Sequence, residues 1–224
     1  MRTPLLAIAS AALLLAACTA TNGQTDLPQT GTGMQQSSVM QNVLSGTGNV
    51  SLSERLLSGG ILEIGDAHAP VSLTLFINYS SSYSQQFDQK LLPQLMHDFV
   101  STGQLRVGIV PLELKKYPDS NTSAELLLCA AKQGKGRAMN DLLFGNASAS
   151  ELQKKINDIG LDVHTLQSCM QSDDMKTMLA QEAQTANAYS ITLVPSYLLS
   201  GHVYTGLPEY SDLKGQVHDA LNGR

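Results

Sequence analysis

Residues 73–87 constrain the fold more than any other part of the sequence. An apolar, β-rich run over 71–77 lies between Pro70 and Asn78, and its spacing is not that of a helix. Beyond it, apolar residues recur at every fourth position from Phe87, which predicts a helix over roughly 82–101. Serines occupy the junction, where their hydroxyls suit the first turn of a helix. Many α/β proteins hold a reactive or anionic group at such a junction, because the helix dipole favours negative charge there.

The segment 78–87 resembles the active-site segment of DsbA-like proteins of the thioredoxin fold, whose usual pattern is Asp-Tyr-x-Cys-Pro-Tyr-Cys-x-x-Phe. On this match Ser81 stands at the position of the attacking cysteine and Ser84 at that of the resolving cysteine. Ser82 replaces the proline, and Tyr83 is kept. The resemblance implies an α/β, thioredoxin-like fold with a helical insertion. It also implies protein disulfide oxidoreductase activity in the family, but both catalytic cysteines are absent here.

Other segments within residues 49–224 agree with this fold. Strands are predicted over 61–64 and 104–110, and the order of strand, helix and strand predicts a βαβ unit with parallel strands. Residues from about 120 to 188 predict four to five helices, which resembles the family's helical insertion. Pro93 should kink the helix that contains it. Residues 51–57 predict a short helix, with a serine and a glutamate spaced as in a capping box.

The last part of the chain returns to strand. Residues 190–199 predict a strand, 202–205 a hairpin partner and 209–221 a final helix. Val194-Pro195 in this pattern resembles the cis-proline segment of the thioredoxin fold. In the family that loop faces the active-site turn and leaves backbone groups free to pair with an extended peptide. The resemblance therefore implies a peptide-binding site at Ser81, Ser82, Tyr83, Val194 and Pro195.

The N-terminal residues carry export signals. Residues 1–17 combine Arg2 with an apolar run that is too short to span a membrane, as in a secretory signal peptide. The sequence Leu-Ala-Ala-Cys ending at Cys18 resembles the lipobox of bacterial lipoproteins, which implies acylation of Cys18, with palmitate among the chains. Thr19 then implies sorting to the outer membrane, facing the periplasm. The alternative is a plain signal peptide. Residues 18–48 lack an apolar period and predict a flexible linker, or a leader without a role.

Composition excludes some partners. The net charge is −5 without a basic cluster, so we predict no nucleic-acid partner. The five histidines are scattered along the 224 residues, so we predict no metal site, and no motif indicates a cofactor.

Two cysteines remain after Cys18. Cys129 and Cys169 lie in separate predicted helices of an exported protein and do not form a Cys-x-x-Cys motif. We expect a structural disulfide between them; the alternative is two buried free thiols. A catalytic role is not expected, because structural disulfides are poor oxidants.

The serines limit the chemistry that the site can perform. Disulfide exchange needs an attacking thiolate and a resolving thiol, and a serine hydroxyl supplies neither. Hydrolysis by Ser81 would need a neighbouring general base, which the sequence does not indicate. We therefore predict a redox-inactive module, a chaperone or assembly factor, that binds an exported polypeptide or another envelope protein.

Two alternatives stay open. In kappa-class glutathione transferases, which share the fold, a serine at this helix start donates to the thiolate of glutathione, and Ser81 could act in that way. In the other alternative the serines only cap the helix, and the function lies on another surface, such as the helical insertion.

Overall fold

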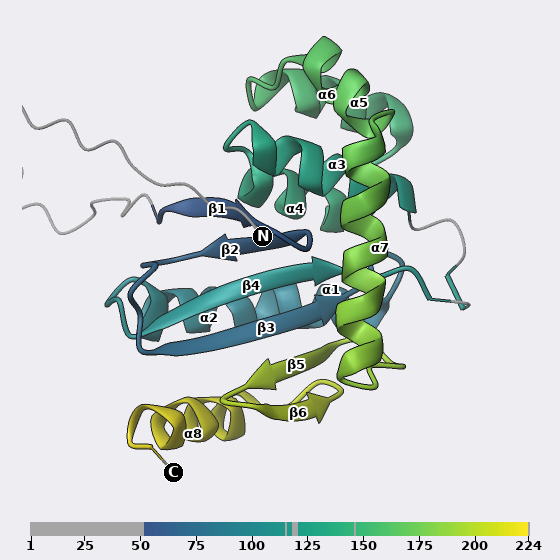
Figure 1. Ribbon diagram of the computed structural model, residues 1–224. Helices are drawn as coiled ribbons and strands as arrows, with labels where there is room; N and C mark the ends of the chain where they lie inside the picture. Colours follow the sequence, from purple (N-terminus) through teal and green to yellow (C-terminus); the bar gives the residue numbers. More distant parts are fainter. Residues whose placement is uncertain (1–51, 115, 118–120, 146, 224) are drawn as a thin grey trace, which may run out of the picture. The chain divides into compact units, whose positions relative to one another are not determined.

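The computed structural model describes residues 52–114, 116–117, 121–145 and 147–223 (Figure 1). The predicted signal peptide, the linker and Cys18 lie outside these residues. The described strands form one six-stranded mixed sheet in the order β1-β2-β4-β3-β5-β6. Their bounds are β1 Glu54–Leu57, β2 Ile61–Ile64, β3 Val71–Ile77, β4 Leu105–Pro111, β5 Ser196–Leu199 and β6 His202–Thr205.

The two longest strands form the centre of the sheet and confirm the predicted βαβ unit. β3 and β4 run parallel, in a register that pairs Val71 with Leu105 and Ile77 with Pro111. Alternate residues therefore face opposite sides of the sheet. Leu75 packs into the larger core, while Phe76 packs on the other side with Val110. Both strands end at the same edge of the sheet, and the site is built there.

The predicted helix over 51–57 is wrong, because its second half is strand β1. β1 pairs antiparallel with β2, and Gly59 and Gly60 make the turn with positive φ angles of 86° and 74°. Two glycines between apolar runs are a hairpin signal that outweighs the capping-box pattern. Glu54 still caps a helix, but a distant one: its carboxylate accepts hydrogen bonds from the backbone N–H groups of Gly136 and Arg137.

The helical segment that follows β3 is irregular around Pro93. It consists of α1 Ser82–Gln86, the π-helical η1 Phe87–Leu91, α2 Leu92–Leu95 and the π-helical η2 Met96–Val100. Proline has no N–H to donate within the helix, which disturbs the regular ladder of hydrogen bonds. The segment lies against one face of the sheet (Figure 1) and buries Phe87, Leu95 and Phe99 there.

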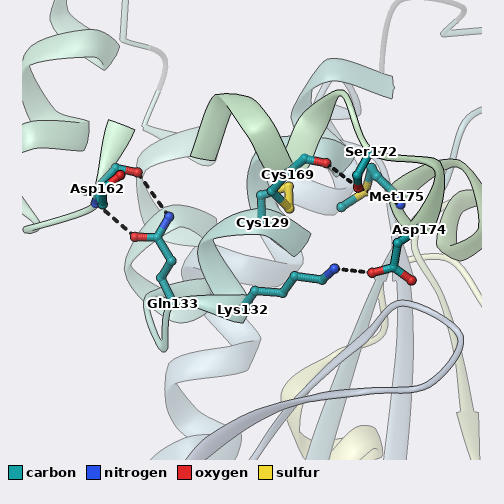
Figure 2. The surroundings of a disulfide bond; sticks show 8 residues. All are labelled: Cys129, Lys132, Gln133, Asp162, Cys169, Ser172, Asp174 and Met175. Carbon is teal, nitrogen blue, oxygen red and sulfur yellow. Dashed lines mark hydrogen bonds and ion pairs between the residues drawn. A yellow bond between two sulfur atoms is a disulfide. The ribbon is translucent and has the colours of Figure 1, made fainter. Parts of the chain in front are cut away.

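The helical insertion confirms the expected block of four to five helices and consists of five. They are α3 Asn121–Lys132, α4 Gly136–Phe144, α5 Ala149–Asp158, α6 Val163–Met170 and α7 Asp173–Ala188. Cys129 of α3 and Cys169 of α6 form a disulfide, as expected (Figure 2). Beside it Lys132 forms an ion pair with Asp174. α7 runs across the ends of β3 and β4, where these strands stop (Figure 1).

The C-terminal part contains the expected hairpin and a last helix, α8 Tyr210–Leu221. β5 pairs antiparallel with both β3 and β6. It begins at Ser196, later than predicted, because Ser190 has a positive φ of 54° and Pro195 cannot donate to a strand ladder. The peptide bond Val194–Pro195 is cis, which confirms the prediction. Within the described residues, no helix has the length and apolar character that a membrane span requires.

Candidate functional site

The candidate site is a groove at the edge of the sheet where β3 and β4 end. Parallel strands bring their carboxyl ends to one edge, and the antiparallel β5 begins at that same edge. The loops that meet there therefore come from distant parts of the sequence. They enclose a groove of about 860 Å³. Its lining residues are Ser81, Tyr83, Glu113, Leu114, Lys116, Tyr117, Asn187, Ile191, Thr192, Leu193, Val194, Pro195, Thr205, Gly206 and Leu207.

The groove exposes large apolar side chains. Tyr83 and Leu193 are each 61% exposed, although most side chains of their size are covered in folded domains. Tyr83 lies in the first turn of α1 and Leu193 in the loop before the cis-proline, and both line the groove. Exposed apolar residues that gather around a concave surface mark binding sites for proteins or peptides.

The cis-proline loop is held firmly from one side only. The hydroxyl of Ser196 donates to the backbone oxygen of Leu193 at 2.8 Å, and Gly206 donates its N–H to the backbone oxygen of Pro195 at 2.8 Å. Among the described residues, none makes a hydrogen bond to the backbone N–H or C=O of Val194. A loop that is fixed on one side and has unpaired backbone groups on the other suits the addition of an extended chain.

The hydroxyls of Ser81, the N-cap of α1, and of Ser84 in its first turn both accept hydrogen bonds from the backbone. Ser81 is only 2% exposed, and its hydroxyl accepts a hydrogen bond from the backbone N–H of Ser84 at 3.3 Å. The hydroxyl of Ser84, which is fully buried, accepts from the backbone N–H of Asn78 at 3.3 Å. Among the described residues that line the groove, there is no histidine to act as a general base for Ser81.

A buried polar network joins the turn to the helical insertion. Tyr79 donates from its hydroxyl to the side-chain oxygen of Asn140 at 3.0 Å, and the amide of Asn140 donates to Asp88 at 2.6 Å. Burial raises the pKa of Asp88 to about 6, and burial raises the pKa of Tyr79 well above its ordinary value. The amide of Gln85 donates to the backbone oxygen of Phe144. The network therefore fixes the start of α1 against the end of α4.

These features are those of a known family, whose model, described as thioredoxin, matches residues 58–219. The chain belongs to the thioredoxin family. Its DsbA-like form, with a helical block inserted into the thioredoxin fold, confirms the resemblance seen in the active-site segment. A comparison with curated proteins gives no match.

Solved structures support this fold. A thioredoxin-like oxidoreductase from Silicibacter pomeroyi DSS-3 is 20% identical, with a TM-score of 0.64 over 73% of this chain and 93% of that one. BdbD from Bacillus subtilis is 16% identical, with a TM-score of 0.65 over 77% and 98%. The thiol-disulfide exchange protein alpha-DsbA2 from Wolbachia pipientis is 12% identical, with a TM-score of 0.61 over 76% and 88%. At identities this low, the TM-scores show that these proteins and this chain share a fold.

The thioredoxin fold brings most of the predicted site residues together. Ser81, Tyr83, Val194 and Pro195 all line the groove, whereas Ser82 is exposed and lies outside its lining. Sequence reasoning missed the other eleven of the fifteen lining residues, which include Leu114, Leu193 and Leu207. Leu193 had a usable signal, a large apolar residue directly before Val194-Pro195. The residues after β4 had none of their own, because only the parallel pairing of β3 and β4 brings them to the groove.

Replacement of Ser81 tests its capping role. We expect Ser81→Ala to lower the free energy of unfolding by about 1 kcal/mol, the usual cost of losing an N-cap hydroxyl. Ser82→Ala, one position along and exposed, should change it by less than about 0.5 kcal/mol. Urea denaturation of both variants makes the comparison. Equal stability of the two variants would contradict a capping role for Ser81.

Proposed function

We propose that this thioredoxin-family protein is a redox-inactive module that binds extended segments of exported polypeptides in its groove. The observation that carries the proposal is that Tyr83 and Leu193 are exposed in the same groove as the backbone of Val194, which has no hydrogen-bond partner among the described residues. A bound segment would pair with Val194 by strand addition and place its apolar side chains against these two residues. Such recognition tolerates many sequences, because the backbone supplies much of the binding, and this suits a chaperone or assembly factor.

The absence of sulfur in the groove supports the redox-inactive part of the proposal. The turn that faces the cis-proline carries Ser81 and Ser84, and no described residue that lines the groove is a cysteine. Cys129 and Cys169 are joined to each other in the insertion, and Cys129 is fully buried. Exchange needs an accessible thiolate and a second thiol to resolve the mixed disulfide.

The proposal places the protein in the bacterial cell envelope, anchored by a lipid on Cys18 and facing the periplasm from the outer membrane. The lipobox resemblance and the signal-peptide pattern of residues 1–17 support this location. One protein of similar structure is a periplasmic thioredoxin-like protein from Salmonella enterica serovar Typhimurium, 16% identical with a TM-score of 0.58 over 84% of this chain and 99% of that one.

A paired assay on the purified full chain tests the proposal. We expect it to suppress aggregation of a reduced, unfolded protein and to bind apolar peptides, but not to oxidise, reduce or isomerise disulfides. Tyr83→Ala and Leu193→Ala should each weaken peptide binding about tenfold, because each removes a large apolar contact at the centre of the groove. Fluorescence anisotropy with a labelled peptide gives the affinities.

Tyr189→Ala is the matched control, because Tyr189 is 42% exposed but does not line the groove. Its affinity for the peptide should equal that of the wild type. Disulfide-exchange activity of the wild type would refute the redox-inactive reading. Equal losses from Tyr83→Ala and Tyr189→Ala would show that general surface hydrophobicity, and not the groove, is responsible.

A further inference from the structure

One buried carboxyl oxygen among the described residues has no hydrogen-bond partner. In the described parts of the chain, Oε1 of Glu182 is the only buried side-chain oxygen or nitrogen without a hydrogen bond. Glu182 lies on α7 and is 2% exposed. The β1–β2 turn approaches it so closely that a Cβ on Gly60 would lie 2.5 Å from Oε1. A carboxyl group that is enclosed without a partner destabilises a fold, so its presence indicates a use.

Glu182 lines a second cavity that adjoins the peptide groove. This cavity has a volume of about 690 Å³. It shares Glu113, Leu114, Asn187 and Ile191 with the groove, so the two cavities are direct neighbours. A chain bound in the groove therefore has a side pocket within reach.

The lining of this side pocket combines aliphatic walls with negative charge. Leu112, Leu179 and several alanines supply the walls. Glu113 and Glu182 are the only ionisable residues among the described residues of its lining. Long basic side chains have the matching character, an apolar stem with a cationic end.

We propose that the side pocket receives a lysine or arginine side chain of the bound polypeptide and that Glu182 pairs with its cationic group. This inference rests on the proposed function and names a preference of the same site. The methylene stem packs against the walls of the pocket, and the ammonium or guanidinium group reaches the carboxyl group at its buried end. The polypeptides selected are then apolar segments that carry a basic residue.

The protonation of Glu182 is consistent with this occupant. Burial raises the pKa of Glu182 to about 9, so the carboxyl group is protonated at neutral pH when nothing pairs with it. An arriving cation favours the ionised form, and the carboxyl group then loses its proton. Tyr79 is a titratable neighbour whose own pKa is raised in part by Glu182, and Glu113 is the other carboxylate in the lining. The described residues offer no group of three metal ligands, which favours an organic cation over a metal ion.

Matched peptides test the preference. In one series of short apolar peptides, a single lysine is placed at each position in turn. In the matched series, norleucine replaces that lysine, which keeps the aliphatic side chain but removes the charge. On the full chain at pH 7, we expect one register in which the lysine peptide binds about tenfold more tightly than its counterpart. Glu182→Gln should remove this preference, so that the lysine peptide binds no more tightly than its norleucine counterpart. Calorimetry in buffers of different ionisation enthalpy should show release of about one proton on binding of the lysine peptide only.

The outcomes separate this inference from the proposed function. If neither peptide binds, the proposed function fails and this inference fails with it. If both bind equally well in every register, the groove binds peptides and only the basic pocket is refuted. A preference that is lost in Glu113→Gln but kept in Glu182→Gln would assign the cation to Glu113 and overturn the role of Glu182. The melting temperature of Glu182→Gln should not be lower than that of the wild type, which checks that the variant is folded.

Discussion

Removal of the disulfide between Cys129 and Cys169 is expected to lower the free energy of unfolding by about 4 kcal/mol in the chain-entropy model. The bond closes a loop with a sequence separation of 40, and opening it returns conformational freedom to the unfolded chain. For a domain of this size the loss corresponds to a fall of roughly 10 °C in the melting temperature. The double variant Cys129→Ala/Cys169→Ala, followed by calorimetry, measures it.

The consequence should be greatest in the helical insertion. Cys129 is fully buried on α3, which packs against α4, while Cys169 brings α6 to the same place (Figure 2). The polar contacts at this corner of the insertion are an ion pair of Lys132 with Asp174 and the hydrogen bonds that Gln133 exchanges with the backbone of Asp162. α6 itself buries only Leu166 fully. Hydrogen exchange should therefore rise first in α6 of the variant.

Two controls define that prediction. Reduction of the wild-type protein with dithiothreitol should reproduce the melting temperature of the double variant, and Cys18→Ala should leave it unchanged. If the free energy of unfolding falls by less than about 1 kcal/mol in the double variant, the reduced, unfolded chain retains structure around the two cysteines. A disulfide that forms and breaks during turnover of a substrate would contradict its structural role.

The fold could be predicted from the sequence where the local sequence pattern is strong. The run over 71–77 is β3, because a short, β-rich and mainly apolar segment between a proline and an asparagine strongly favours a buried strand. The Val194-Pro195 peptide bond is cis, as its place in the family pattern implied. The prediction of a helix over 51–57 was wrong, because a capping-box pattern and a hairpin signal both occur there. Only the pairing with β2 decides between the two.

The candidate site could be predicted only in part, because only some of its residues lie in recognisable motifs. Ser81, Tyr83 and Pro195 carry local signals, since they lie in motifs of the family. Leu114 and Glu182 carry none, because neither belongs to a motif or an unusual composition. Their importance arises from the meeting of β4, α7 and the β1–β2 turn, which depends on contacts between distant segments. A buried glutamate on a helix is indistinguishable in sequence from an exposed one.

Replacement of that glutamate should stabilise the protein in a pH-dependent way. Burial raises the pKa of Glu182 to about 9 in the folded protein, against an ordinary value of 4.5. Below pH 4.5 the group is protonated in both states and has no effect. As the pH rises from 4.5 to 9, only the unfolded chain loses the proton, so the stability of the wild type falls through this window. Glu182→Gln removes the effect, because glutamine is neutral in both states.

The size of that stabilisation follows from the difference between the pKa values of Glu182 in the unfolded and folded protein. At pH 7 we expect Glu182→Gln to raise the free energy of unfolding by roughly 3 kcal/mol, and by less than about 1 kcal/mol below pH 5. Urea denaturation of the peptide-free protein at a series of pH values measures the difference. Glu113→Gln is the control, and its difference from the wild type should not grow over the same range. If the wild-type and Glu182→Gln curves stay parallel from pH 5 to 9, the carboxyl group is ionised in the folded protein and must already be paired. If they diverge, the fold tolerates a destabilising group that only an incoming cation would satisfy, as expected of a binding residue.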